Sequence, residues 1–250
     1  SNTRVVGEFF TTERFWGGPD SIKISFVLDC NRPIKSIDGW NEKGVLPDVE
    51  AIAGNAAGMV LNFGQLNAEE LLFKMAFSYT SVDNAIANMD AELNHWDFDK
   101  VCKETRSVWN EALGRIAVEG GTDAQKTVFY TALYHLLIHP NILQDVNGEY
   151  PAMESDKILT TKGDRYTVFS LWDTYRNVHQ LLTLVYPERQ MEMVRTMLDM
   201  YREHGWLPKW ELYGRETLTM EGDPSIPVIV DTWMKGLRDF DVDLAYEAMY

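Results

Sequence analysis

Hydrophobic and polar residues follow two different periods along this chain, and the change falls near residue 80. The first part carries short runs of β-branched, aromatic and aliphatic residues at positions 5–10, 22–29, 58–63 and 72–79. In the second run Ile22, Ile24, Phe26 and Leu28 alternate with other residues, as in a strand with one buried face. Connections rich in turn-forming residues occur at positions 17–19, 38–39, 44 and 47. The first eighty residues therefore predict strands of a β-sandwich.

Beyond residue 80 the apolar residues recur at helical spacing. Ser81 is a typical N-cap residue, and Thr122 with Gln125 forms a capping box. Pro187 suits the first turn of a helix, and Gly205 suits the position just after one. The predicted helices cover residues 81–93, 98–116, 122–139, 171–185, 187–204, 227–239 and 241–250.

Helices with broad apolar faces and alternating short and long connections are typical of an α/α toroid or barrel built from helical hairpins. About six and a half predicted helices amount to half of a closed double ring of twelve, and the last apolar pattern is still running at Tyr250. We therefore predict a multidomain β + α chain that is an internal portion of a larger protein. Residues 1–80 would end a β-sandwich, residues 81–120 would form a helical linker region, and residues 121–250 would form the first half of an (α/α)6 barrel.

The composition limits the classes of partner. The chain has 250 residues, is 45% hydrophobic and carries a formal net charge of -15 at pH 7. This acidic charge argues against nucleic acid as a partner, because its phosphates would be repelled. No apolar run approaches the roughly 18–20 residues that a membrane span needs. Cys30 and Cys102 are too few to set a disulfide framework and do not fix the redox compartment.

A first group of candidate site residues follows Phe169. Ser170 and Asp173 have the spacing of a capping box, which places the Asp173 carboxylate in the first turn of a helix. Capping alone is one interpretation of this carboxylate. If the helix start instead opens onto the mouth of an α/α barrel, Asp173 can accept hydrogen bonds from ring hydroxyls while Trp172 stacks on the ring. Arg176, one turn further on, would then hold the carboxylate in place.

A second group lies in the long connection between residues 205 and 224. Its chemistry-bearing residues are Trp206, Lys209, Trp210, Glu211, Glu216 and Asp223. Long connections tend to be binding or catalytic loops, and exposing tryptophan is costly. Flat aromatic faces beside hydrogen-bond acceptors suit a ligand with apolar ring faces and a hydroxyl-rich rim, such as a sugar. The alternative is a packed loop that braces its helices, with Asp223 capping the next one.

The general acid and base of a sugar-cleaving reaction, and any metal ligands, are not identified by these residues. Two carboxylates serve as acid and base in most glycosidases, and their separation decides the stereochemical outcome, but this connection offers too many carboxylates to choose from. His135 and His139 have i, i+4 spacing without the glutamate of an HExxH zinc motif. No metal ligands are therefore predicted in this chain.

An ordered series of motifs spans nearly everything after residue 55. Its segments are residues 78–92, 96–99, 129–135, 145–150, 170–176, 205–211, 216–220, 222–224 and 235–241. In this series the chain resembles the calcium-dependent exo-α-mannosidases of glycoside hydrolase family ninety-two. The resemblance implies a β-sandwich joined to an (α/α)6 barrel, inverting hydrolysis of terminal α-linked mannose from glycans, and a calcium ion that helps to distort the sugar ring.

The resemblance also implies which residues line the sugar pocket, with Asp173 in direct contact with the terminal mannose. The expected substrate-binding residues are Trp172, Asp173, Arg176, Trp206, Lys209, Trp210, Glu211, Glu216 and Asp223. Family members place the acid, the base and the calcium ligands in motifs that do not occur here, so the catalytic residues and the calcium ligands are expected C-terminal to this chain. The full-length protein is expected to be a periplasmic or secreted exo-α-mannosidase, and residues 1–250 alone are expected to be inactive.

Two alternatives stay open. One is another (α/α)6 carbohydrate enzyme, such as a trehalase-like or phosphorylase-like protein. The other is a non-catalytic sugar-binding or scaffold module. The sequence predicts neither the mannosidic linkage preference nor the oligomeric state.

Overall fold

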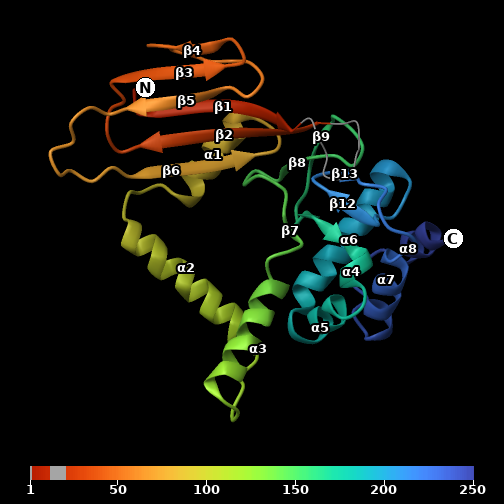
Figure 1. Cartoon of the computed structure of the whole chain (residues 1–250). Coiled ribbons are helices and arrows are strands. Elements are labelled where there is room, and N and C mark those ends of the chain that lie inside the picture. Colours follow the sequence, from red (N-terminus) through yellow and green to blue (C-terminus); the bar gives the residue numbers. More distant parts are fainter. Residues whose placement is uncertain (1, 12–20) are drawn as a thin grey trace. The chain divides into compact units, whose positions relative to one another are not determined.

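The computed structural model describes residues 2–11 and 21–250, which divide into two compact units (Figure 1). The first unit comprises the described residues up to Phe9 together with Ile24–Trp96, and the second comprises the remaining described residues. The helical region expected at residues 81–120 is thereby divided between the two units. The turn expected at residues 17–19 lies outside the described residues.

The first unit contains two antiparallel three-stranded sheets. One has the order β1-β2-β6 and the other the order β4-β3-β5. The strands are β1 (Arg4–Thr11), β2 (Ile22–Cys30), β3 (Ser36–Asn41), β4 (Gly44–Leu46), β5 (Gly58–Asn62) and β6 (Phe73–Ser78). The sequence predicted β1, β2, β5 and β6, but it was wrong to treat β3 and β4 as connections. Gly39 is a weak strand former by itself, yet here a side chain would crowd Val49 and Ile52, which a Cβ would approach to 3.1 and 3.2 Å.

The alternation predicted for β2 is confirmed at its centre. Phe26 and Leu28 pack on the hydrophobic cluster that contains the buried Val5, whereas Val27 points to the opposite face and is fully buried. On that face α1 (Val82–Glu92) packs against the sheet. The predicted N-cap is also confirmed, because the Ser81 hydroxyl accepts a hydrogen bond of 3.1 Å from the Asn84 amide.

The second unit is mainly helical. Its helices are α2 (Phe98–Leu113), α3 (Asp123–Leu136), α4 (Leu171–Thr174), α5 (Val178–Val185), α6 (Pro187–His204), α7 (Ser225–Met234) and α8 (Val242–Met249). The predicted capping box of Thr122 and Gln125 is present, and α6 begins at Pro187 and ends at Gly205, whose φ is 89°. α6 forms much of the core, and Figure 1 shows α5 and α7 beside it. Its fully or almost fully buried residues include Met193, Val194, Met197, Leu198 and Met200.

Several helix predictions were wrong in extent, and those for residues 98–116 and 122–139 each ran three residues too far. The helix expected at residues 171–185 is interrupted, since α4 ends at Thr174 and α5 begins at Val178. The helix expected to run toward Asp239 ends at Met234, because Gly236 adopts a φ of 91°, which a right-handed helix cannot contain. None of the helices in the described ranges is both long enough and apolar enough to cross a membrane.

Short strands that periodicity did not predict connect the helices of the second unit. They are β7 (Asn141–Ile142), β8 (Glu149–Pro151), β9 (Ile158–Thr160), β10 (Tyr166–Thr167), β11 (Phe169–Ser170), β12 (Trp210–Leu212) and β13 (Arg215–Glu216). β10 pairs with β7, β8 pairs with β9, and β12 lies between β11 and β13. The described chain is thus a β plus α structure, and the connection between α6 and α7 contains regular structure instead of an open loop.

Candidate functional site

A tight β-hairpin forms the centre of the 205–224 connection. β12 and β13 are joined by Tyr213 and Gly214, whose φ values of 51° and 80° both lie in the left-handed region. Such two-residue turns match the right-handed twist of the strands they connect. Glycine also permits a close approach here, since a Cβ on Gly214 would lie 3.3 Å from the carbonyl oxygens of Pro151 and Ala152.

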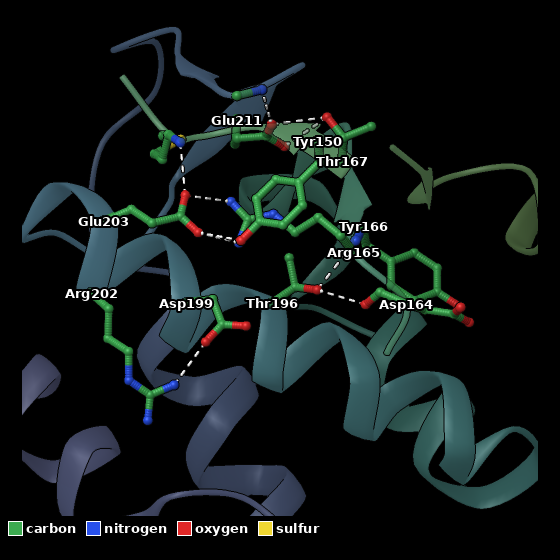
Figure 2. Close-up of polar contacts among 12 residues, drawn as sticks. Tyr150, Asp164, Arg165, Tyr166, Thr167, Thr196, Asp199, Arg202, Glu203 and Glu211 are labelled. Carbon is green, nitrogen blue, oxygen red and sulfur yellow. Dashed lines mark hydrogen bonds and ion pairs between the residues drawn. The ribbon is translucent and has the colours of Figure 1, made fainter. Parts of the chain in front are cut away.

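The carboxylate of Glu211 fastens this hairpin to the strands before α4. Glu211 is fully buried, and one of its oxygens accepts a 2.6 Å hydrogen bond from the Gly214 amide. The other oxygen accepts a 3.0 Å hydrogen bond from the Val168 amide. The Thr167 hydroxyl lies 2.9 and 3.1 Å from the two oxygens (Figure 2). Burial raises the pKa of Glu211 to about 7, against the effects of the Gly214 amide and the Thr167 hydroxyl, which lower it. The structure therefore places Glu211 inside the scaffold, bonded to protein donors on both oxygens.

Glu216 orders the backbone on both sides of the hairpin. Its half-buried carboxylate accepts hydrogen bonds of 2.8 Å from the Lys209 amide, 3.1 Å from the Trp210 amide and 3.2 Å from the Leu218 amide. Its own amide donates to the Glu154 carboxylate at 2.6 Å. Glu216 therefore holds the connection in one shape while it remains partly accessible to a ligand.

Several residues around these two carboxylates have a left-handed backbone. The φ values are 63° at Val168, 51° at Tyr213, 56° at Leu218 and 65° at Met220. Each such residue costs about 1–3 kcal/mol and persists only where the surroundings hold it, which is common at functional sites. The amide of Val168 is held by Glu211 and that of Leu218 by Glu216, so the two glutamates stabilise the strained positions.

A cavity of about 440 Å³ opens beside this hairpin, within the usual size range of small-molecule sites. It is lined by Met153, His204, Trp206, Leu207, Lys209, Glu216, Leu218, Asp223, Ile226, Ala248, Met249 and Tyr250. The structure thus brings together Trp206, Lys209, Glu216 and Asp223 among the residues singled out from the sequence. The Trp206 side chain is 73% exposed, and the Lys209 Nζ lies 3.7 Å from the nearer Asp223 oxygen. An accessible indole beside an amine and carboxylates can bind a ring bearing hydroxyl groups.

Trp172, Asp173 and Arg176 form a separate group on and just after α4. Asp173 is exposed, and its carboxylate accepts a hydrogen bond from the Ser170 hydroxyl. The Ser170 side chain makes no capping bond, so the predicted capping box is not formed. The predicted role of Arg176 was also wrong, since its guanidinium lies 4.9 Å from the Trp172 ring centre and 5.0 Å from that of Tyr175. In place of an ion pair with Asp173, Arg176 makes cation–π contacts.

The two groups are joined through the sheet that precedes α4. Ser170 of β11 lies opposite the half-buried Trp210 of β12, and the Leu171 amide donates to the Lys209 carbonyl at 3.2 Å. The start of α4 is therefore bonded directly to the connection that carries the cavity. Trp172 is 36% exposed and accessible to a ligand, whereas Trp210 contributes its backbone to the sheet.

Sequence reasoning missed a buried ion pair between Arg165 and Glu203. Arg165 donates to the two Glu203 oxygens at 3.0 and 2.9 Å, and the Tyr150 hydroxyl and the Met153 amide donate to the same carboxylate at 2.9 and 2.7 Å (Figure 2). Burial raises the pKa of the Tyr150 hydroxyl, so it remains a donor. Arg165 lies in no periodic segment, and the only sequence signal is that Glu203 directly precedes the His204–Trp206 stretch.

Carboxylate, histidine and cysteine side chains do not gather into a metal-binding cluster in the part of the chain that the structure describes. Within residues 2–11 and 21–250, no three histidine, cysteine, aspartate or glutamate side chains converge so that they could hold a metal ion. The carboxylates near the cavity are instead bonded to amides, hydroxyls and Lys209.

A family model for the glycosyl hydrolase family 92 catalytic domain matches residues 84–250. The chain belongs to glycosyl hydrolase family 92. The structure of this family 92 chain is similar to that of an inverting mannosidase of the same family from Bacteroides thetaiotaomicron, with a TM-score of 0.89 and 30% identity over 98% of this chain and 33% of that one.

Other proteins similar to this family 92 chain are also glycosidases by their descriptions. An α-mannosidase of the family from Bacteroides thetaiotaomicron has a TM-score of 0.86 and 28% identity over 100% of this chain and 34% of that one, and its complex with mannoimidazole has also been solved. A protein described as an uncharacterized secreted glycosidase from Arthroderma benhamiae is 29% identical over 181 residues, which are 70% of this chain and 19% of that protein. The chain thus spans about a third of the solved relatives and about a fifth of the curated one.

Proposed function

We propose that the protein containing this chain is an exo-α-mannosidase that removes terminal α-linked mannose from glycans with inversion of configuration. The observation that carries the proposal is the cavity lined by Trp206, Lys209, Glu216 and Asp223 in a chain that belongs to family 92. Two solved relatives are named mannosidases, one of them inverting, and one was solved with mannoimidazole. We also propose that the helices of the second unit belong to an (α/α)6 barrel.

Each accessible side chain has a role that follows from its chemistry. The exposed indole of Trp206 stacks on an apolar face of the sugar, and Lys209, Glu216 and Asp223 bind hydroxyl groups. Asp173 accepts hydrogen bonds from hydroxyls of the terminal mannose. Among the described residues only the Ser170 hydroxyl donates to this carboxylate, so acceptor capacity is left for a ligand.

We assign the calcium ligands, the general acid and the general base to residues outside the described part of the chain. Calcium would supply charge and coordination that help to distort the bound sugar, and its ligands, like the general acid and base, would come from elsewhere in the protein. Residues 1–250 alone are therefore expected to bind sugar without turnover. A periplasmic or secreted location is proposed because one relative is described as secreted.

The test is hydrolysis of a set of α-linked mannobiosides by the full-length protein, with the first-formed anomer followed by NMR. We expect free mannose to be released as the β-anomer, and a chelator to abolish the reaction until calcium is restored. Initial release of the α-anomer would contradict inversion. Cleavage of α,α-trehalose without release of mannose would favour a trehalase-like enzyme, and sugar binding without any turnover would favour a binding module.

A further inference from the structure

Four polar side chains, three of them buried, form a series of hydrogen bonds across the second unit. The Thr174 hydroxyl lies 2.8 Å from His179 Nε2, and His179 Nδ1 lies 2.9 Å from Gln190 Oε1. Gln190 Nε2 lies 2.9 Å from the Thr232 hydroxyl. These residues belong to α4, α5, α6 and α7 in turn, and His179, Gln190 and Thr232 are at most 1% exposed. Burying so many polar groups is costly unless every one of them is satisfied.

The direction of each hydrogen bond in this series follows from the bond that Thr232 makes at its end. The Thr232 hydroxyl donates to the Val228 carbonyl at 2.7 Å, so it accepts from the Gln190 Nε2 amide group. Gln190 Oε1 therefore faces His179 and requires a proton on Nδ1. His179 Nε2 is then unprotonated and accepts the hydroxyl proton of Thr174. Reversing any one bond would bring two donors or two acceptors together.

The protonation state of His179 agrees with this assignment. Burial lowers its pKa to about 4, so the ring is neutral at physiological pH. A neutral ring with one donor and one acceptor is what the chain of bonds requires. The imidazole is thus locked in one tautomer and one orientation between α4 and α6.

This series of hydrogen bonds contacts α4 at Thr174, its last residue. α4 is a single turn, too short to be stable as an isolated helix, and three residues separate it from α5. Two side chains from the first turn of α5 bond back to α4 and to Tyr175, the residue that follows it. His179 accepts from the Thr174 hydroxyl, and the Gln180 amide group donates to the Tyr175 carbonyl at 2.7 Å. Trp172 and Asp173 lie on that same turn.

We propose that His179 is a positioning residue for the sugar site, which acts through Thr174 to hold α4 and thereby sets the positions of Trp172 and Asp173. Gln190 and Thr232 form the anchor that fixes the tautomer of His179. The inference rests on the proposed function, because it assumes that Asp173 binds the terminal sugar. It goes beyond that function in assigning a role to a buried histidine that is well removed from solvent.

The deciding variant is Thr174→Val in the full-length protein, which replaces the hydroxyl by a methyl group of similar size. His179→Phe is the obvious alternative, but it leaves Gln190 Oε1 without its partner in the core, so an effect on folding could not be separated from an effect on positioning. Thr174→Ser restores the hydroxyl. Thr183→Val is the matched control, because Thr183 is a buried threonine of the neighbouring helix, and its hydroxyl donates within α5 to the Gln180 carbonyl at 2.7 Å.

The first measurement is amide hydrogen exchange of residues 171–176, which needs no substrate. We expect exchange in this segment to be at least fivefold faster in Thr174→Val and unchanged in Thr174→Ser and Thr183→Val. Unchanged exchange in Thr174→Val, or an equal increase in Thr183→Val, would overturn the proposal. Nitrogen NMR of His179 in the wild type should show a protonated Nδ1 and an unprotonated Nε2, and the opposite tautomer would overturn the assignment.

The second measurement is kcat/KM for release of terminal α-mannose. We expect at least a tenfold loss in Thr174→Val, recovery to within threefold in Thr174→Ser, and no loss in Thr183→Val. Faster exchange with unchanged kcat/KM would mean that α4 is held for stability alone, which also overturns the proposal. If the wild type releases no mannose, the proposed function fails, while the exchange measurement still decides whether His179 holds α4.

Discussion

The guanidinium of Arg165 and the carboxylate of Glu203 meet side by side through two hydrogen bonds of 3.0 and 2.9 Å (Figure 2). Their side chains are only 1% and 8% exposed. Arg165 directly precedes β10, which carries a hydroxyl partner of Glu211, and Glu203 lies in the last turn of α6, just before Trp206. This pair therefore connects the strands that hold the hairpin to the helix that leads into the cavity.

The first prediction concerns this buried pair. Glu203→Ala leaves the Arg165 charge buried without its partner, so we expect the free energy of unfolding to fall by about 3–5 kcal/mol. Arg202→Ala at the neighbouring position is the control, because Arg202 is half exposed and pairs with Asp199 and Asp241 at the surface. Such pairs contribute about 0–1 kcal/mol. Urea unfolding of the full-length variants measures both, and equal losses would contradict the assigned role of burial.

The second prediction concerns the polarity of the Glu211 site. Both oxygens of this carboxylate face amide or hydroxyl donors, so the amide group of Glu211→Gln must point at a donor. We expect a loss of about 1–3 kcal/mol at neutral pH, as for other buried groups left unsatisfied. Glu111→Gln on the exposed face of α2 is the control for the substitution itself.

The stability contributed by Glu211 should also depend on pH with a definite sign. Its pKa in the folded protein is raised from 4.5 to about 7, so the folded state keeps a proton that the unfolded state has lost between these values. The contribution is therefore complete below pH 4.5 and is lost as the pH rises through about 7, by up to about 3 kcal/mol. Unfolding is measured for the wild type and for Glu211→Gln at several pH values. The free energy of unfolding of the wild type minus that of Glu211→Gln should fall as the pH rises, and an increase with pH would refute the assignment.

The parts of the fold that the sequence predicted depend on neighbouring residues. Ser81 and Thr122 begin helices through bonds to residues three positions on, and Gly205 ends α6 through its own φ. β3 was missed because Gly39 is favourable only where Val49 and Ile52 fold over it, and that contact is not visible in local spacing.

The sequence predicted which residue types form the site better than it predicted where each side chain lies. The sequence identified four residues that do line one cavity, because tryptophan and carboxylates are unusual in a connection. It did not separate Glu216, which lines the cavity, from Glu211, which lies inside the scaffold, since that difference depends on bonds to Thr167 and Val168 more than forty residues away. The substrate contacts themselves remain predictions.

The third prediction tests Asp173. Its carboxylate is exposed and is bonded to the Ser170 side chain, so Asp173→Ala should change the free energy of unfolding by no more than roughly 1–2 kcal/mol. If the carboxylate binds sugar hydroxyls, kcat/KM for terminal α-mannose should fall at least a hundredfold, because a site built for a hydroxyl loses much when its acceptor is removed. Asp243→Ala is the control, since Asp243 is also an exposed acid in the first turn of a helix. Global unfolding of Asp173→Ala would mean that its role is structural.

The last prediction tests the stacking role of Trp206. This indole is 73% exposed, so Trp206→Ala should leave the free energy of unfolding within about 0.5 kcal/mol of the wild type. The substitution removes a stacking contact that contributes about 0.5–1.5 kcal/mol, and it also removes the apolar area that the indole buries on the ligand. We therefore expect binding of mannoimidazole to weaken about tenfold or more.

Trp233→Ala is the control for Trp206→Ala. Trp233 is 37% exposed, lies on α7 of the same unit, is not among the residues that line the cavity, and is covered by Arg238, whose guanidinium lies 4.4 Å from its ring centre. Titration calorimetry with mannoimidazole measures the affinity of the full-length wild type, Trp206→Ala and Trp233→Ala. Equal affinities for wild type and Trp206→Ala would remove Trp206 from the sugar site, whereas equal losses in both variants would show that the effect is not specific to the cavity.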